Sequence, residues 1–169
     1  MPTQLPAKTP AKGVSGTRRE SDAITILTKD HANVKSMFEE YQALGDRALS
    51  SKKKLATKIC TALTKHATAE EELFYPAVRT VGGESEELVD QATVEHASAK
   101  ALIAQILAME PSDDFYDATV KVLSEQIDHH VQEEEREMFP KARKSNLDLV
   151  ALGLQIEARK AEVETPVSH

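Results

Sequence analysis

The chain contains 169 residues, carries a formal net charge of −7, and has 40% hydrophobic but only 4% aromatic residues. This length suits one domain with short extensions, and the negative charge argues against a nucleic-acid-binding surface on the folded body. We expect no membrane span, because no apolar run approaches the roughly 20 residues that cross a bilayer. We also expect no signal peptide, because no hydrophobic segment follows the N-terminal charges. The single cysteine, Cys60, has no partner for an internal disulfide, which favours a reducing cytoplasm.

Residues 1–20 form a predicted disordered basic tail. They contain three prolines and two glycines, and four basic side chains against one acidic side chain give this segment a charge of +3. A segment of this composition has too few hydrophobic residues to form a packed core. The predicted folded domain therefore begins at residue 21.

Beyond residue 20 the sequence predicts an all-α protein. Alanine, leucine, glutamate and lysine are abundant, and apolar residues recur at spacings of three and four. Ser21 or Asp22 can cap the first helix and Ser85 the third, while Gly45–Ser51, Gly82–Gly83 and Pro111–Asp113 form turns. Short turns between long helices predict an up-down-up-down four-helix bundle over residues 21–144. After the first helix, the bundle helices are expected at residues 52–79, 85–109 and 114–144.

A fifth helix is predicted within the C-terminal segment, residues 145–169. Ser145 and Asp148 together can cap its start, and we expect it to end near Val163. Residues 164–169 are expected to fray. Its apolar side is predicted to carry Leu147, Val150, Leu154 and Ala158.

The second and fourth predicted helices repeat each other at a constant offset of 64 positions. The first and third helices match at an offset of 65, so the chain consists of two similar helical hairpins. Pro76 lies near the end of the second helix, where its missing backbone donor is expected to bend or weaken the last turn. The aligned pairs are His66 with His130, Glu70 with Glu134, Glu71 with Glu135, Tyr75 with Phe139, Pro76 with Pro140, and His31 with His96.

Each predicted bundle helix carries a histidine on its apolar stripe. On the second helix this stripe is predicted to continue beyond Glu70 to Leu73 and Ala77. On the second and fourth helices a glutamate follows that histidine by four positions, which places both side chains on one face about 5–6 Å apart at Cβ. His129 lies roughly 100° around the helix from His130 and is expected to point outside the bundle. The side chains expected to converge on the bundle axis are His31, His66, Glu70, His96, His130 and Glu134.

The other acidic residues near these positions have different expected roles. Glu71, Glu72, Glu133 and Glu135 are predicted to face solvent. Glu95, which precedes His96, is the strongest candidate for an additional ligand or for a hydrogen-bond partner of a ligand.

Metal binding explains why two carboxylates and four imidazoles would occupy one apolar core. Burial of such groups is unfavourable unless something pairs with them, and no lysine or arginine lies on these stripes. Six ligands exceed the four of a tetrahedral zinc site, and their equal division suits two metals about 3.5–4 Å apart with bridging carboxylates. Mixed imidazole and carboxylate ligands around open positions suit iron, with manganese or zinc as substitutes. We therefore expect two non-haem iron ions joined by an oxo or hydroxo bridge.

The pattern of ligands resembles that of the hemerythrin-like HHE cation-binding domain over residues 22–144. It consists of two His-x-x-x-Glu motifs, each followed by an acid and an aromatic–proline pair, and of one histidine on each remaining helix. The resemblance implies a four-helix bundle around a di-iron centre that handles dioxygen or related small molecules. It also implies the same six ligands, with Glu70 and Glu134 as bridges.

One difference from the oxygen-carrying hemerythrins bears on the expected activity. Those proteins have a second histidine four residues along on the third helix and an aspartate in the last motif. Here Ala92 and Lys100 flank His96 at that spacing, and the last carboxylate is Glu134. More open coordination favours peroxide or nitric oxide chemistry, sensing or iron handling over reversible dioxygen carriage.

The leading hypothesis from the sequence is a cytoplasmic di-iron protein that binds dioxygen or turns over peroxide or nitric oxide. The enzymatic activity considered is consumption of peroxide, as by a catalase or peroxidase. One alternative is a non-catalytic oxygen or iron sensor, or an iron-handling module. Another alternative is a structural helical bundle without metal. The sequence leaves the physiological ligand and the oligomeric state open.

Overall fold

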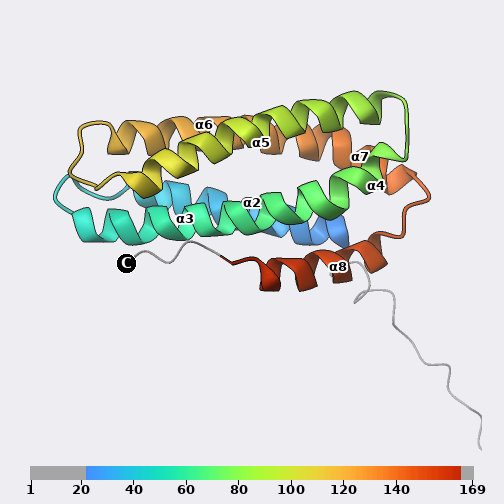
Figure 1. Ribbon diagram of the computed structural model, residues 1–169, viewed down its shortest axis with the longest axis horizontal. Helices are drawn as coiled ribbons and strands as arrows, with labels where there is room; N and C mark the ends of the chain where they lie inside the picture. The colour runs from blue at the N-terminus through green and yellow to red at the C-terminus, as the bar shows by residue number, and fades with distance from the viewer. Residues whose placement is uncertain (1–21, 165–169) are drawn as a thin grey trace, which may run out of the picture.

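The computed structural model describes residues 22–164, and these residues form an all-α fold (Figure 1). The tail expected at residues 1–20 and most of the expected C-terminal tail lie outside the described residues. Within residues 22–164 no helix is both long and apolar enough to span a membrane. The helical segments are α2 (Ala23–Gln42), α3 (Leu49–Ala69), η1 (Glu70–Phe74), α4 (Tyr75–Arg79), α5 (Glu84–Ala108), α6 (Tyr116–Glu133), η2 (Glu134–Met138), α7 (Phe139–Lys144) and α8 (Leu149–Glu162).

Four long helices make up the bundle. Segments α3, η1 and α4 follow one another without a break, as do α6, η2 and α7, while α2 and α5 complete the set. Short connections join them at alternate ends, with α2 packed along α3 and α5 along α6 (Figure 1). Helix α8 lies outside the bundle against α2 and α3. The predicted up-down-up-down bundle with a fifth helix is confirmed.

The apolar core is divided into two clusters. One contains Leu27 and Phe74 together with residues of α8, and the other contains Val34, Ile59 and Leu123. Along α2, His31 lies between Leu27 of the first cluster and Val34 of the second. The polar residues singled out by the sequence therefore occupy a layer between two dry regions.

The first two bundle helices begin differently: α2 has a side-chain cap and α3 has none. Asp22 caps α2 as expected, because its carboxylate accepts a hydrogen bond from the Thr25 backbone at 2.8 Å. Helix α3 begins at Leu49, three residues earlier than predicted. Ser50 and Ser51, which were expected to precede this helix, occupy its first turn. The backbone N–H groups of a first turn have no partner within the helix.

The starts of the other two bundle helices also differ from prediction. Gly82 and Gly83 form the expected turn, and both have positive φ angles of 77° and 61° that glycine adopts without strain. Helix α5 begins directly after Gly83, so the expected cap, Ser85, lies inside the first turn and is buried. Helix α6 begins at Tyr116, two residues later than predicted.

Helices α3 and α6 both widen into a π-turn at the glutamate of their His-x-x-x-Glu motif. In η1 the Tyr75 N–H donates to the carbonyl of Glu70, five residues back, and η2 repeats this bond at the equivalent positions. Pro76 follows immediately; it lacks a donor, and its ring would collide with the carbonyl four residues back in a regular helix. The π-turn relieves this conflict, and such turns are frequent at functional sites.

The π-turn changes which side chains face the core. A regular α-helix would direct Leu73 and Ala77 inward, as the sequence stripe predicted, but both are only half-buried. Phe74 and Val78 are instead completely buried. The extra residue in the wide turn advances the buried face by one position, so this part of the prediction was wrong.

Helix α8 agrees with the sequence in position but not in orientation. Asp148 caps it by accepting a hydrogen bond from the Ala151 backbone at 3.0 Å. Leu154, predicted to face the core, is 66% exposed, whereas Leu152 and Ile156 are buried. Aliphatic residues occur on several sides of this short helix, so their spacing does not select one face.

Candidate metal centre

All six residues predicted to converge are found together in the polar layer of the bundle. None of these six residues exposes more than 6% of its surface. Two come from each of the long helices that carry a π-turn, and one each from α2 and α5. The residues are His31 on α2, His66 on α3, Glu70 on η1, His96 on α5, His130 on α6 and Glu134 on η2.

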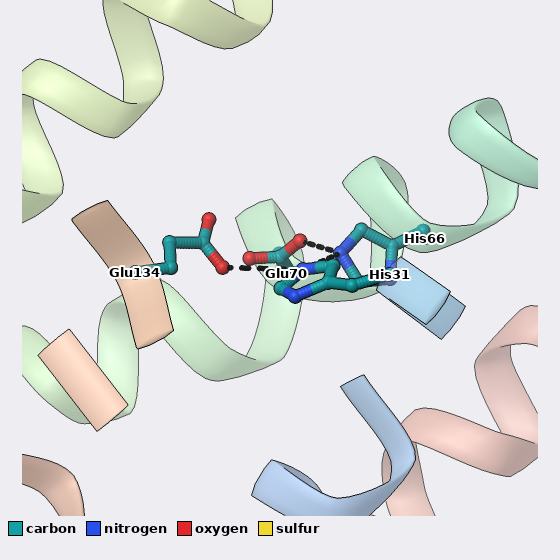
Figure 2. A group of neighbouring side chains, drawn as sticks. All are labelled: His31, His66, Glu70 and Glu134. Carbon is teal, nitrogen blue, oxygen red and sulfur yellow. Dashed lines mark hydrogen bonds and ion pairs between the residues drawn. The ribbon is translucent and has the colours of Figure 1, made fainter. Parts of the chain in front are cut away.

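The donor atoms form two groups that share both carboxylates. His31 and His66 belong to one group and His96 and His130 to the other, and Glu70 and Glu134 belong to both. Within each group the ligand atoms lie within 4.8 Å of one another. Figure 2 shows the first group, in which Glu134 approaches from the side opposite His66. Carboxylates common to two ligand groups are the arrangement that a bridged pair of cations requires.

The imidazoles of each group point their Nε2 atoms at one another. The distance between the Nε2 atoms is 3.1 Å for His31 and His66 and also 3.1 Å for His96 and His130. Glu134 spans the two groups, with its Oε1 2.5 Å from His130 Nε2 and its Oε2 3.6 Å from His31 Nε2. Glu70 contacts His66 Nε2 within its own helix.

An outer layer of acidic residues fixes the orientation of the histidine rings. The Nδ1–H of His66 donates to Asp30 at 2.9 Å, and that of His130 donates to Glu95 at 3.1 Å. Each acid precedes the histidine of its own helix by one position and serves the histidine of the neighbouring helix. Such hydrogen bonds select the tautomer that leaves Nε2 free to bind a metal. The hydrogen-bonding role expected of Glu95 is confirmed.

Glu71 and Glu135 do not simply face solvent as predicted. Glu135 Oε1 accepts a hydrogen bond from His31 Nδ1 at 3.1 Å, and Glu71 Oε2 lies 3.6 Å from His96 Nδ1. The π-turn that starts one residue earlier in each helix rotates these acids towards the opposite hairpin. The prediction for Glu72 holds, since its side chain is exposed and pairs with Arg159.

Tyr75 is a site residue that reasoning from the sequence missed. It is 2% exposed, and its hydroxyl donates a hydrogen bond to Glu134 Oε1. The hydroxyl oxygen of Tyr75 lies 3.0 Å from His96 Nε2 and 3.3 Å from His130 Nε2. Its position among three donors of the second group makes it a seventh potential ligand atom. The signal in the sequence was the repeat, which pairs this tyrosine with a residue that has no hydroxyl.

That residue, Phe139, breaks the symmetry of the two halves. Its ring lies parallel to the His31 imidazole, with centroids 5.7 Å apart and an interplanar angle of 5°. It also meets Phe74 edge to face at 5.5 Å. The first donor group is therefore closed by an apolar ring at the place where the second group has a phenol.

Several buried polar atoms at the site lack a hydrogen-bond partner among the described residues. These atoms are both carboxylate oxygens of Glu70, Oε2 of Glu134 and Nδ1 of His96. Unpaired buried carboxylate oxygens are strongly unfavourable in a finished core. Their number and their convergence fit bound cations, and mixed oxygen and nitrogen donors fit first-row transition metals.

The two carboxyls are electrostatically unequal when no metal is bound. Burial raises the pKa of Glu70, and the nearby charge of Glu134 raises it further, to about 7. Burial also acts to raise the pKa of Glu134, but the charge and hydrogen bond of His130 outweigh it and lower that pKa. Two buried carboxylates this close cannot both stay ionised without a neighbouring positive charge.

The four histidines also fall into two pairs, one with lowered and one with raised pKa values. Burial lowers the pKa of His31 to about 4 and that of His96 to about 3. Burial also opposes charge on His66 and His130, but Glu70 and Glu134 respectively raise their pKa values to about 10 and about 11. Without metal, protons on two imidazoles thus balance the carboxylates, and cations would take over this role.

His129 lies outside the centre, as its helical position predicted. Its side chain is 67% exposed and lies 3.2 Å from Glu133 Oε1 and 4.0 Å from Glu95 Oε2. The adjacent histidines of this helix therefore have different environments, and only His130 enters the buried layer.

Known proteins share this fold and part of this sequence. A DNA nickase from Nostoc sp. (strain PCC 7120) is 34% identical over 120 residues, which are 70% of this chain but only 32% of that protein. A crystal structure of a hemerythrin HHE cation binding domain-containing protein from Mycobacterium kansasii superposes with a TM-score of 0.70 at 22% identity, covering 83% of this chain and 86% of the other. The family model of the hemerythrin HHE cation binding domain matches residues 22–142, which include all six buried donors and all of the bundle except the last two residues of α7. The chain therefore belongs to the hemerythrin HHE cation-binding domain family.

Proposed function

We propose that the chain binds two iron ions, one at each donor group, with Glu70 and Glu134 shared between them. The observation that carries this proposal is the pair of donor groups with two carboxylates in common, whose oxygens have few or no hydrogen-bond partners. A purely structural bundle would have to balance these carboxylates with protons on His66 and His130, although burial opposes charge on both imidazoles. Imidazole and carboxylate donors suit iron, and manganese or zinc are the expected substitutes.

The proposed reaction partner is dioxygen, peroxide or nitric oxide. When bound, a pair of iron ions exchanges electrons with such small molecules at the positions that protein ligands leave open. The residues around the centre fix the ligands and keep water away. Asp30 and Glu95 hold two ligand rings in place, and the apolar clusters exclude water on either side. Tyr75 holds a proton on its hydroxyl beside Glu134, since burial and the adjacent carboxylates raise the pKa of this phenol well above its usual value.

Neither DNA cleavage nor export is part of the proposal. The Nostoc relative is named a DNA nickase, but this chain matches 32% of its length, and a net charge of −7 opposes binding to a phosphate backbone. We place the protein in the cytoplasm, because its one cysteine, Cys60, is a buried thiol.

The reactivity can be tested with iron-loaded protein that has been reduced without oxygen. Mixing with oxygenated buffer in a stopped-flow spectrometer should give rapid oxidation to a stable form that does not revert under vacuum. Added hydrogen peroxide should then be consumed, and a His130→Ala variant should not consume it. Reversible recovery of the reduced spectrum under vacuum would make the protein a carrier instead. Absence of peroxide consumption, combined with iron-dependent melting, would favour the sensor or iron-handling alternative.

A further inference from the structure

An apolar cavity of about 280 Å³ adjoins the candidate metal centre. All four ligand histidines form part of its wall, whereas Glu70, Glu134 and Tyr75 do not. The carboxylates and the phenol therefore lie on one side of the imidazoles, and the cavity lies on the other. A molecule in the cavity would therefore contact the imidazole side of the centre.

The remaining wall of the cavity is mostly apolar. Its two charged residues, Asp30 and Lys100, are each paired with an opposite charge, Asp30 with Lys160 at 2.7 Å and Lys100 with Glu71. Leu63, Ile103 and Ile127 contribute aliphatic side chains. Thr64 and Thr68 also line it, but their hydroxyls donate to carbonyls of their own helix at 2.7 and 2.8 Å. These threonines therefore present their methyl groups to the cavity. A cavity with such a wall tends to stay dry and to accept apolar molecules.

The cavity results from a difference between the two hairpins. At the repeat offset of 64, Ala67 corresponds to Val131, and at the offset of 65, Val34 corresponds to Ala99; all four residues line the cavity. Alanine thus occupies α3 and α5 where the equivalent helices carry valine. The missing methyl groups create space specifically between α3 and α5.

The size of the cavity exceeds what the small molecules named above need. One water-sized molecule takes up about 30 Å³ of liquid, and an apolar protein cavity of about 150 Å³ is sufficient to bind benzene. A volume of about 280 Å³ accommodates a molecule with an aryl or branched alkyl body. Lys100, Ala104 and Leu107 of its wall are exposed, so the cavity opens to solvent and an apolar ligand can enter it.

The entrance of the cavity favours a neutral molecule. Lys100 is the cationic residue of its wall, and its ammonium group pairs with Glu71 Oε1 at 2.6 Å. This lysine is therefore already neutralised and offers little attraction to a carboxylate on a ligand. The apolar wall would likewise penalise a charged group.

We propose that this cavity binds an organic hydroperoxide, with its apolar body between α3 and α5 and its peroxide end towards the four imidazoles. The inference extends the proposed function, since it names the class of peroxide that the same centre meets. Hydrogen peroxide would reach the centre but leave most of the cavity empty. An aryl or branched alkyl hydroperoxide would fill both the cavity and the approach to the metals.

The test uses 2-phenyl-2-propanol, an alcohol with an aryl body that does not react as a peroxide. Titration calorimetry with the metal-loaded full chain should show saturable binding. Ala67→Val and Ala99→Val each introduce the residue of the equivalent helix and add two methyl groups to the wall. Each should weaken binding by roughly tenfold or more, since even one methylene changes binding by about that factor in a close-fitting apolar pocket. Ala97→Val, at an exposed position of α5, is the matched control and should bind as the parent chain does.

Metal content measured on every variant separates this inference from the proposed function. A parent chain that holds its metals but shows no saturable binding would overturn the inference alone. Equal affinity in the Ala67→Val or Ala99→Val variant, with metals retained, would also overturn it. Crystals of the metal-loaded parent soaked with a brominated analogue give a test that needs no substitution, because anomalous bromine density should lie between α3 and α5; density elsewhere would contradict the proposal.

Discussion

The hydroxyl of Tyr75 donates a hydrogen bond to the carboxylate of Glu134, which belongs to the opposite hairpin of the bundle. Both residues are positioned by π-turns: Tyr75 follows η1 directly, and Glu134 is the first residue of η2. This bond has no counterpart in the other half, where Phe139 replaces the tyrosine. The two metal positions proposed here are therefore chemically different although the helices around them are similar.

Replacement of Tyr75 by phenylalanine should affect both stability and the metal centre. The metal-free variant should lose roughly 1–3 kcal/mol of unfolding free energy, because a buried hydrogen bond to a charged group disappears. The iron-loaded variant should also show an altered optical spectrum. Tyr41→Phe is the control: it removes a hydroxyl bonded to Asp117 at 2.7 Å, remote from the centre, and should leave the spectrum unchanged. Identical spectra for Tyr75→Phe and the parent chain would place Tyr75 outside the centre.

The two adjacent histidines of α6 should differ in their effect on metal binding. His130→Ala removes a buried donor that no neighbouring residue of α6 can replace, and it should abolish binding of the metal pair. His129→Ala removes an exposed side chain and should leave most of the binding intact. Metal content after dialysis, measured for both variants, distinguishes them. Equal losses would show that the assignment of the inward-facing histidine is incorrect.

Removal of metal should loosen the bundle. Without cations the core retains two carboxylates and four imidazoles, so the metal-free protein should melt at a lower temperature. A ligand present at 100 times its dissociation constant stabilises a protein by about 2.7 kcal/mol, which sets the scale for each site. Calorimetry before and after treatment with a chelator measures the shift. The chelator should not change the melting temperature of His130→Ala; an unchanged temperature for the parent chain would refute the prediction.

The cap of α2 gives a prediction for pH dependence. Partial burial acts to raise the pKa of Asp22, but hydrogen bonds from Thr25 and Arg143 outweigh it and lower that pKa. A carboxyl whose pKa is lower in the folded state than in the unfolded state stabilises the folded protein. This contribution is fully present above the unfolded-state pKa of about 3.9, and it is lost as the pH falls through the folded-state pKa. Asp22→Ala should therefore lower the unfolding free energy by about 1 kcal/mol at pH 7. Denaturation series should show the difference from the parent chain shrinking below pH of about 4; a constant difference would contradict this cause.

The six buried donors could be predicted because two regular features of the sequence agree. The spacing of apolar residues defined one inward face on each of four helices, and the repeat then selected His130 over His129. Both depend on ordinary α-helical geometry, which holds from the start of each helix to its ligand glutamate. The fold class followed from the same spacing and from the short turns between helices.

The parts of the site that were not predicted lie at or beyond the point where that geometry changes. At Glu70 the helix widens, and every later residue advances by one position relative to an α-helix. Phe74 therefore replaced Leu73 in the core, and Tyr75 entered the site. Glu71 was assigned to solvent because a regular helix would have turned it away from His96. Pro76 signalled an irregularity, but proline alone does not specify a π-turn.

The face of α8 could not be predicted for a different reason. A helix of the bundle has partners on both sides of its apolar stripe, whereas α8 packs on the outside of the bundle against α2, α3 and η1. Leu152 and Leu154 are equally hydrophobic, and only the docking against α2 and α3 makes one buried and the other exposed. Tertiary contacts, not local spacing, decide its orientation.

The most direct test of the proposed di-iron centre is the number of metal ions bound per chain. The full chain, produced with iron supplied and freed of loosely bound metal, should contain about two iron ions per molecule by elemental analysis, in keeping with two donor groups that share their carboxylates. A protein that retains its helical fold but binds one ion, or none, under these conditions would contradict the assignment of Glu70 and Glu134 as bridges between two metals.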